Sequence, residues 1–166
     1  FFFLDDTFTI NRDRALRLCK LLIKENLQIK YKISSRIDKV DKELLHYLAK
    51  SGCYRIHYGV ESGSQRVLDY LQKEILVEQI YKVIEMTKNE KIQIFVYMMI
   101  GVPTETKEEM LQSVELINKI KPDHVNYSIC SPFPKTYLYE QALIEAQVKD
   151  DYWQSFAENP DSSFKI

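Results

Sequence analysis

Two periods of apolar residues alternate along this 166-residue chain, and that alternation constrains its fold more than any other feature. Apolar residues at every second position predict strands, and apolar residues every three to four positions predict helices. The predicted strands begin 25 to 38 residues apart, which leaves room for one helix between each pair. Neighbouring parallel strands need such a crossover. The pattern therefore predicts an α/β fold with a parallel sheet.

The same patterns set the expected element boundaries. We expect strands at about 1–4, 29–34, 54–60, 92–101 and 124–130, and helices at about 12–25, 41–51, 64–72, 77–90, 106–120 and 136–146. Asn11 is expected to cap the first helix, and Thr106 with Glu109 fits a capping box at the fifth. The repeating pattern then stops, so we expect one domain over 1–147 and an irregular tail over 148–166.

The two faces of the predicted strands differ in chemistry. Every second residue of a strand shares a face, and one face is apolar enough to pack under helices. The other face carries polar, small and aromatic residues: Lys30, Lys32, Ser34, Arg36, Arg55, His57, Gly59, Glu61, Gln93, Phe95, Tyr97, Met99, Gly101, His124, Asn126, Ser128 and Cys130. An ordinary barrel fills its interior with branched aliphatic residues. We therefore expect a curved sheet with helices outside and a wet concave cavity; a sheet with one solvent face is the alternative.

Composition narrows the class of protein. The 23 Lys and Arg residues balance 24 Asp and Glu residues, so the basic excess that nucleic acids or anionic membranes require is missing. Cys19, Cys53 and Cys130 are too far apart for a disulfide framework or a metal motif, which suits a reducing compartment. We find neither a membrane-length apolar run nor a signal peptide. We expect a cytoplasmic protein with a small-molecule substrate and no nucleic-acid or membrane partner.

Polar residues and glycines gather where the predicted strands end. Ligands of parallel βα folds bind beyond the carboxyl ends of the strands. Those ends are Asp5-Asp6-Thr7, Ser34-Ser35-Arg36, Gly59-Val60-Glu61-Ser62-Gly63, Gly101-Val102-Pro103-Thr104-Glu105 and Ser131-Pro132-Phe133-Pro134. Acids, a guanidinium, hydroxyls and flexible backbone suit a polar, zwitterionic ligand that carries a sugar. The chain has no phosphate-binding P-loop.

Six segments keep a characteristic order and spacing over about residues 1–140. They are Phe3-Leu4-Asp5-Asp6-Thr7-Phe8, Arg36-Ile37-Asp38, Gly52-Cys53 with the later Gly59-Val60-Glu61-Ser62-Gly63, Lys73, Met99-Ile100-Gly101-Val102-Pro103-Thr104-Glu105-Thr106, and Pro132-Phe133-Pro134. In this order they resemble the barrel of radical S-adenosylmethionine (SAM) enzymes, most closely the branch that usually carries a cobalamin-binding domain. The resemblance implies a partial, TIM-like parallel βα barrel, with about five of the six βα units of that family.

The resemblance also implies a set of SAM-binding residues. They are Asp5, Asp6, Ser34, Arg36, Glu61, Lys73, Tyr97, Met99 and Gly101. By this resemblance one of the two aspartates accepts hydrogen bonds from the SAM ammonium, Glu61 holds the ribose diol and Lys73 reaches the carboxylate. The remaining residues are expected around the ribose and adenine. A turn or helix cap is the alternative role of the aspartates, and a solvated helix end that of Lys73.

One expected feature of the family is missing from the chain. Radical SAM enzymes hold a 4Fe–4S cluster through a CxxxCxxC loop after the first strand, and no two cysteines here are close enough to form it. The first predicted strand matches the second strand of the family. We therefore expect a fragment whose cluster loop, and any cobalamin domain, lies upstream of Phe1. The whole protein would need an electron donor and would cleave SAM reductively, whereas this piece alone would be inactive.

Two other classes of function stay open at this point. Asp5, Asp6 and Glu61 at strand ends also suit a divalent cation, which would make the chain a metal-dependent barrel lyase or hydrolase. The chain could also be a non-catalytic barrel kept as a scaffold. Magnesium binding without SAM binding would favour the first alternative.

Overall fold

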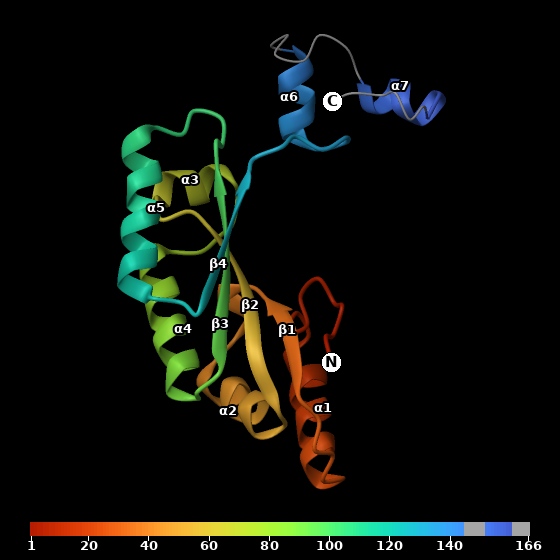
Figure 1. Cartoon of the computed structure of the whole chain (residues 1–166), viewed down its shortest axis with the longest axis vertical. Coiled ribbons are helices and arrows are strands. Elements are labelled where there is room, and N and C mark those ends of the chain that lie inside the picture. The colour runs from red at the N-terminus through yellow and green to blue at the C-terminus, as the bar shows by residue number, and fades with distance from the viewer. Residues whose placement is uncertain (145–151, 161–166) are drawn as a thin grey trace. The chain divides into compact units, whose positions relative to one another are not determined.

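The computed structural model describes residues 1–144 and 152–160, and its chain divides into two compact units, Phe1–Ile129 and Cys130–Ile166. The first unit contains α1 (Arg12–Lys24), β1 (Tyr31–Ser35), the short 3-10 helix η1 (Ile37–Lys39), α2 (Lys42–Lys50), β2 (Cys53–Glu61), α3 (Gln65–Tyr70), α4 (Val77–Asn89), β3 (Gln93–Ile100), α5 (Lys107–Ile120) and β4 (His124–Ile129). The second contains α6 (Tyr137–Ile144) and α7 (Tyr152–Glu158). Figure 1 labels these elements along the chain.

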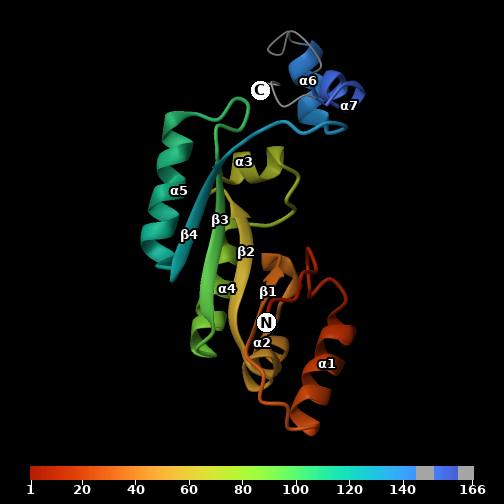
Figure 2. The same ribbon diagram turned by 45° about the vertical axis from the view of Figure 1, so that its right-hand side comes forward.

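The sheet of the first unit is parallel throughout, with strand order β1-β2-β3-β4. β1, β2 and β3 are each followed by a helix that returns the chain to the start of the next strand, as the alternating periods predict. Figures 1 and 2 show α4 and α5 on the same side of the sheet. The fold is therefore α/β, as predicted.

The helix-covered face of the sheet forms the hydrophobic core. Its buried strand residues are Tyr31, Ile33, Ile56, Tyr58, Val60, Ile94, Val96 and Met98. The helices contribute, among others, Leu44 and Leu48 of α2, Ile80 and Ile84 of α4, and Leu116 and Ile120 of α5. Burying each large aliphatic side chain contributes roughly 1.5–3 kcal/mol, so this face supplies most of the stability of the unit.

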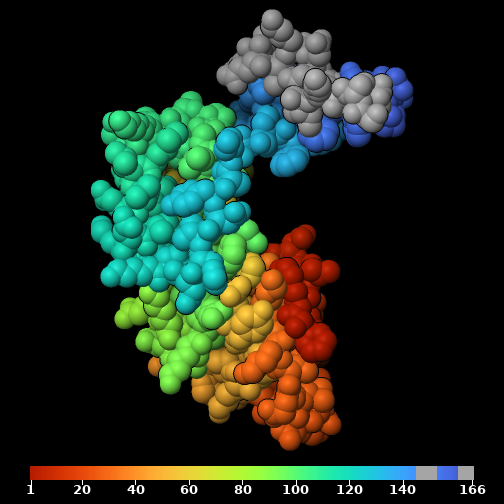
Figure 3. Space-filling model, viewed as in Figure 1, coloured from red at the N-terminus to blue at the C-terminus, as the bar shows by residue number. Residues whose placement is uncertain are grey.

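The opposite face, which we call the open face, carries the polar and aromatic residues that the alternation assigned to it. Gln93, Tyr97, His124, Asn126 and Ser128 are exposed there. In the space-filling view of Figure 3, β2 in yellow, β3 in green and β4 in cyan reach the surface next to one another. The prediction that one face of the sheet is apolar and the other polar and aromatic is confirmed for β1 to β3.

The first predicted strand is much shorter than expected. Phe2 forms a single parallel bridge with Lys32, supported by backbone hydrogen bonds from Phe3 to Lys32 (3.1 Å) and from Lys32 to Phe1 (3.0 Å). The chain then turns at residues 6–9, and the Phe8 N–H donates to the Ser34 carbonyl of β1 at 2.9 Å. The prediction of a full strand over 1–4 is therefore wrong, although its partner strand is the expected one.

The apolar side of β4 also departs from expectation. We expected it to pack under helices as in the other strands, but Tyr127 is 43% exposed and Ile129 is 74% exposed. β4 is the last strand of this sheet, and within the first unit no further βα unit follows it to cover this side.

The second unit contains more regular structure than the expected irregular tail. α7 covers Tyr152–Glu158, and the Gln154 amide donates to Glu158 one turn later, at 2.9 Å. Thr136 caps α6 by accepting from the Tyr139 N–H at 3.3 Å. Irregular structure over the whole of 148–166 is therefore wrong at α7, and residues 148–151 and 161–166 of that tail lie outside the described residues.

Candidate functional site

The carboxyl end of β2 has an irregular backbone. The pairing register between β2 and β3 shifts between Gly59 and Glu61, which is the signature of a bulge. Glu61 has φ of +72°, a left-handed conformation that is uncommon for a residue with a side chain. Bulges re-aim side chains at strand ends, and such strained residues concentrate at functional sites. The irregular backbone therefore sets the direction of the Glu61 carboxylate.

Glu61 forms an ion pair with Lys73, the basic residue that the sequence linked to it. The Lys73 Nζ donates to Glu61 Oε1 at 3.0 Å, and the side chains are only 22% and 17% exposed. A Cβ at Gly59 would lie 2.8 Å from the same Glu61 oxygen and 3.6 Å from Lys73 Nζ. The absence of a side chain at Gly59 thus leaves the space in which this ion pair forms.

Arg36 joins the end of β1 to the same group. Its guanidinium donates to both carboxylate oxygens of Asp38, at 2.8 and 3.3 Å, and to the backbone carbonyl of Lys73 at 2.9 Å. Burial alone would raise the pKa of the Asp38 carboxyl, but hydrogen bonds from Arg36 and Lys39 outweigh burial and lower it. Arg36 is therefore already bound to a carboxylate, and it positions the segment that carries Lys73.

The loop after β3 is held by an acidic side chain. Glu105 Oε2 accepts from the backbone N–H groups of Gly101 at 2.8 Å and Val102 at 3.3 Å. Gly101 has φ of +75°, which glycine adopts at no steric cost. The Gly101 N–H is therefore already bound by Glu105.

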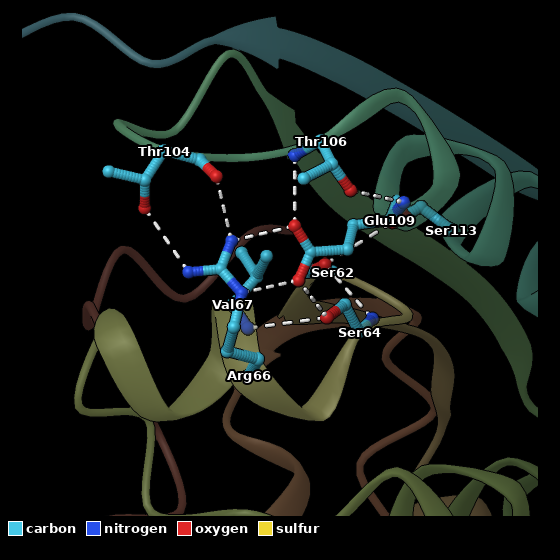
Figure 4. Close-up of polar contacts among 8 residues, drawn as sticks. All are labelled: Ser62, Ser64, Arg66, Val67, Thr104, Thr106, Glu109 and Ser113. Carbon is cyan, nitrogen blue, oxygen red and sulfur yellow. Dashed lines mark hydrogen bonds and ion pairs between the residues drawn. The ribbon is translucent and has the colours of Figure 1, made fainter.

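A bidentate ion pair lies behind this loop. Arg66 at the start of α3 donates to both carboxylate oxygens of Glu109 in α5, each at 2.6 Å (Figure 4). The same guanidinium donates to the hydroxyl of Thr104 at 3.1 Å and to its carbonyl at 2.9 Å. Arg66 therefore connects α3, the loop after β3 and α5.

Glu109 is the centre of this network. Besides Arg66 it accepts from the Thr106 N–H at 2.9 Å and from the Ser64 hydroxyl at 3.0 Å. The Arg66 guanidinium, followed by the backbone N–H of Thr106, holds the pKa of the Glu109 carboxyl well below its usual range. The predicted capping box of Thr106 and Glu109 is confirmed. Its link to Arg66 had no signal in the sequence, because the two partners are far apart along the chain.

Several expected site residues have other contacts. Asp5 forms an ion pair with Arg14 at 2.7 Å, and Asp6 is exposed. The Ser34 carbonyl accepts from the Phe8 N–H at 2.9 Å, and the Ser34 side chain is half-buried on the open face.

Tyr97 and Met99 lie on β3, towards its carboxyl end. The Tyr97 hydroxyl lies 3.2 Å from His57 Nδ1. Met99 is the register partner of Ser128 on β4. The structure thus brings Arg36, Glu61 and Lys73 into one cluster, and the SAM contacts of all nine residues stay predictions.

The described residues do not provide a site for an iron–sulfur cluster. Within 1–144 and 152–160, no group of three His, Cys, Asp or Glu side chains is placed to hold a metal ion. Cys19 and Cys53 are buried, and burial raises the pKa of the Cys53 thiol, which disfavours the thiolate that metals bind. A cluster would need thiolates from outside this set.

Comparisons with known proteins agree with this geometry. The family model described as the radical SAM superfamily matches residues 1–117. An uncharacterized methyltransferase of Pyrococcus horikoshii is 29% identical over 93% of this chain and 34% of its own length. The anaerobic magnesium-protoporphyrin IX monomethyl ester cyclase of Cereibacter sphaeroides is 30% identical over 90% of this chain and 25% of its own length. The chain thus spans between a quarter and about a third of these relatives.

Solved structures show the same fold. The radical SAM methyltransferase TsrM from Kitasatospora setae, with cobalamin and a [4Fe–4S] cluster bound, superimposes with a TM-score of 0.78 at 16% identity, over 87% of this chain and 30% of TsrM. The coproporphyrinogen III oxidase HemN from Escherichia coli gives a TM-score of 0.68 at 19% identity, over 94% of this chain and 38% of HemN. None of the helices in the described ranges is long and apolar enough to cross a membrane. The chain therefore belongs to the radical SAM superfamily, and its sheet is part of the barrel of that superfamily.

Proposed function

We propose that the protein to which this chain belongs cleaves SAM reductively to methionine and a 5′-deoxyadenosyl radical, as an oxidoreductase or methyltransferase acting on a small molecule in the cytoplasm. The family match supports the class of reaction. The observation that carries the assignment to this region is the Glu61–Lys73 pair beside Gly59, at the carboxyl edge where ligands of βα folds bind.

The pair has the chemistry that SAM requires. SAM carries a carboxylate, which matches the Lys73 ammonium, and a ribose diol, whose hydroxyls donate to a carboxylate such as Glu61. Without a ligand the two side chains compensate each other, at 3.0 Å. Because partly buried charges need partners, SAM binding would exchange one set of compensating contacts for another. Arg36 would hold the Lys73 segment in place through its backbone carbonyl.

The cofactors complete the proposal. A 4Fe–4S cluster supplies the electron that breaks a bond to the SAM sulfonium, and we propose that its ligands and electron donor lie outside this chain. The chain alone would then be inactive. Cobalamin is a further candidate, because TsrM and the radical SAM enzyme OxsB contain it in solved structures. We propose it for the whole protein and assign it no residue of this chain.

The test uses the full-length protein and this chain, each reconstituted with iron and sulfide without oxygen. With a reductant and SAM, the full-length protein is expected to form 5′-deoxyadenosine and methionine, and the chain alone to form neither. Failure of the full-length protein to bind SAM and to form either product contradicts the function. Product formed by the chain alone contradicts the assignment of the cluster to outside residues.

A further inference from the structure

A row of stacked rings crosses the open face. We call Phe2, His57, Phe95 and His124 the ring row. Centroids of His57 and Phe95 lie 4.5 Å apart with planes only 4° from parallel. Phe2 stacks beyond His57 at 5.5 Å, and His124 beyond Phe95 at 5.9 Å. His57, Phe95 and His124 are partners in the strand register, so the backbone itself aligns the rings. Offset stacking of this kind makes a firm apolar surface.

His57 keeps this surface uncharged. It is 5% exposed, and burial followed by the charges of Lys32 and Arg55 lowers its pKa to about 4. Its Nδ1 lies 3.2 Å from the Tyr97 hydroxyl, while its Nε2 is buried and has no hydrogen-bond partner among the described residues. A buried polar atom without a partner is uncommon and is a candidate contact for a ligand.

Two cations lie next to the ring row without a carboxylate partner. Lys32 and Arg55 are register partners on β1 and β2. Arg55 donates to the Gln93 amide oxygen at 3.1 and 2.8 Å and to His124 Nε2 at 2.9 Å, and none of these groups is a carboxylate. The Lys32 Nζ lies 4.4 Å from the centroid of the Phe2 ring. Neither cation forms a salt bridge within the described residues.

Asp123, an acidic residue at this end of the sheet, already accepts a hydrogen bond from the backbone. The Asp123 carboxylate accepts from the backbone N–H of Ile94 at 2.7 Å. Two like charges on neighbouring strands repel each other, and an anion between them would relieve that repulsion. The guanidinium fork of Arg55 matches an oxyanion with two oxygens, such as a carboxylate or phosphate.

We propose that the open face binds the substrate of this enzyme, a small molecule with a flat apolar body and an acidic group. The body lies on the ring row, and the acidic group binds Lys32 and Arg55. This rests on the proposed function, since the reacting end of the substrate must reach the carboxyl edge. Arg55 and Gly59 are four residues apart on β2, so the acidic group lies about 13 Å from that edge.

The test uses three probes that share one flat body: 2-naphthoate, 2-naphthyl phosphate and neutral 2-naphthamide. We expect one or both of the acids to bind the full-length protein about tenfold more tightly than the amide, because charge-assisted hydrogen bonds are the stronger kind. Which acid binds better distinguishes a carboxylate substrate from a phosphate substrate. Equal binding of all three probes, or no binding, overturns the proposal.

Substitutions on the open face test where the probes bind. Arg55→Gln and Lys32→Gln are expected to weaken binding of the acids toward that of the amide, while Phe95→Leu weakens acids and amide alike. Arg17→Gln on α1 and Lys82→Gln on α4 are matched controls, because both side chains are exposed on helices. A preference for acids that survives Arg55→Gln in a protein with unchanged circular dichroism overturns the assignment.

SAM binding is measured on the same samples. A protein that binds SAM but shows no preference for the acids contradicts this inference and leaves the proposed function intact. A protein that prefers the acids but binds no SAM contradicts the proposed function instead.

Discussion

The cationic side chains at the two ends of the sheet differ in their partners. Near the carboxyl edge three cations are paired with carboxylates: Lys73 with Glu61, Arg36 with Asp38, and Arg66 with Glu109. At the amino half, the partners of Lys32 and Arg55 among the described residues are rings, an amide and a histidine, and neither cation has a carboxylate. Paired charges fix backbone segments in place, whereas unpaired charges leave a potential that a ligand can use. The comparison separates residues that hold the site together from residues that are available to a substrate.

The largest expected effect comes from adding one methyl group at Gly63, where the backbone packs closely against α5. A Cβ at Gly63 would lie 2.4 Å from the backbone oxygen of Gln112, so Gly63→Ala must displace α5. We expect a loss of about 3 kcal/mol in the free energy of unfolding, measured with denaturant. Gly101→Ala is the control: its Cβ would lie 3.9 Å from Ile129, and only its φ of +75° would cost about 1–2 kcal/mol. Equal losses would contradict the role of close packing.

The ring row predicts a pH dependence of stability. The pKa of His57 is about 4 in the folded protein against 6.5 for the free side chain, so the unfolded state takes up the proton first. Its contribution is fully present above pH 6.5 and is lost as the pH falls toward 4, by up to about 3 kcal/mol. His57→Phe should lose this part of the pH dependence in denaturant titrations. An unchanged pH profile in the variant would show that His57 does not titrate in this way.

Breaking the ion pair at the end of β2 is expected to act on ligand binding. Glu61→Gln keeps the shape of the side chain but removes the charge that faces Lys73 and, by our proposal, the SAM diol. We expect SAM affinity to fall about tenfold in equilibrium binding to the full-length protein. Glu85→Gln, on the exposed side of α4, is the matched control. Unchanged SAM affinity in Glu61→Gln would exclude Glu61 from the SAM site.

The smallest expected effect is a gain in stability. Lys32→Gln removes one of two like charges on neighbouring strands, so we expect a gain of about 0.5 kcal/mol in the free energy of unfolding. The gain should shrink as salt is added, because salt screens the repulsion. Lys82→Gln should leave stability unchanged in the same titration. A loss of stability in Lys32→Gln would mean that the contact of Lys32 with Phe2 outweighs the repulsion.

The features of the fold that depend on local periodicity could be predicted from the sequence. Alternation along β2 and β3 assigned the open and covered faces, and the spacing of strands gave a parallel sheet. Contacts between residues far apart in the chain could not be predicted, because they leave no local pattern in the sequence. The Arg66–Glu109 pair spans 43 residues, and the left-handed φ of Glu61 arises from pairing with β3. The burial of His57 depends on Phe2 and on the rings of Phe95 and Tyr97 in β3, two segments that no single-strand pattern brings together.

The network of Figure 4 has a consequence for motion in the folded state. Arg66 and Glu109 connect the first turn of α3, the loop that follows β3 and the first turn of α5. Segments tied by shared hydrogen bonds open to solvent together as one cooperative unit. Amide hydrogens of all three segments should therefore exchange with deuterium at a common rate, and the loss of Arg66 should release all three at once. The stretch that borders the proposed SAM site then opens and closes as one body, although its parts are far apart in the chain.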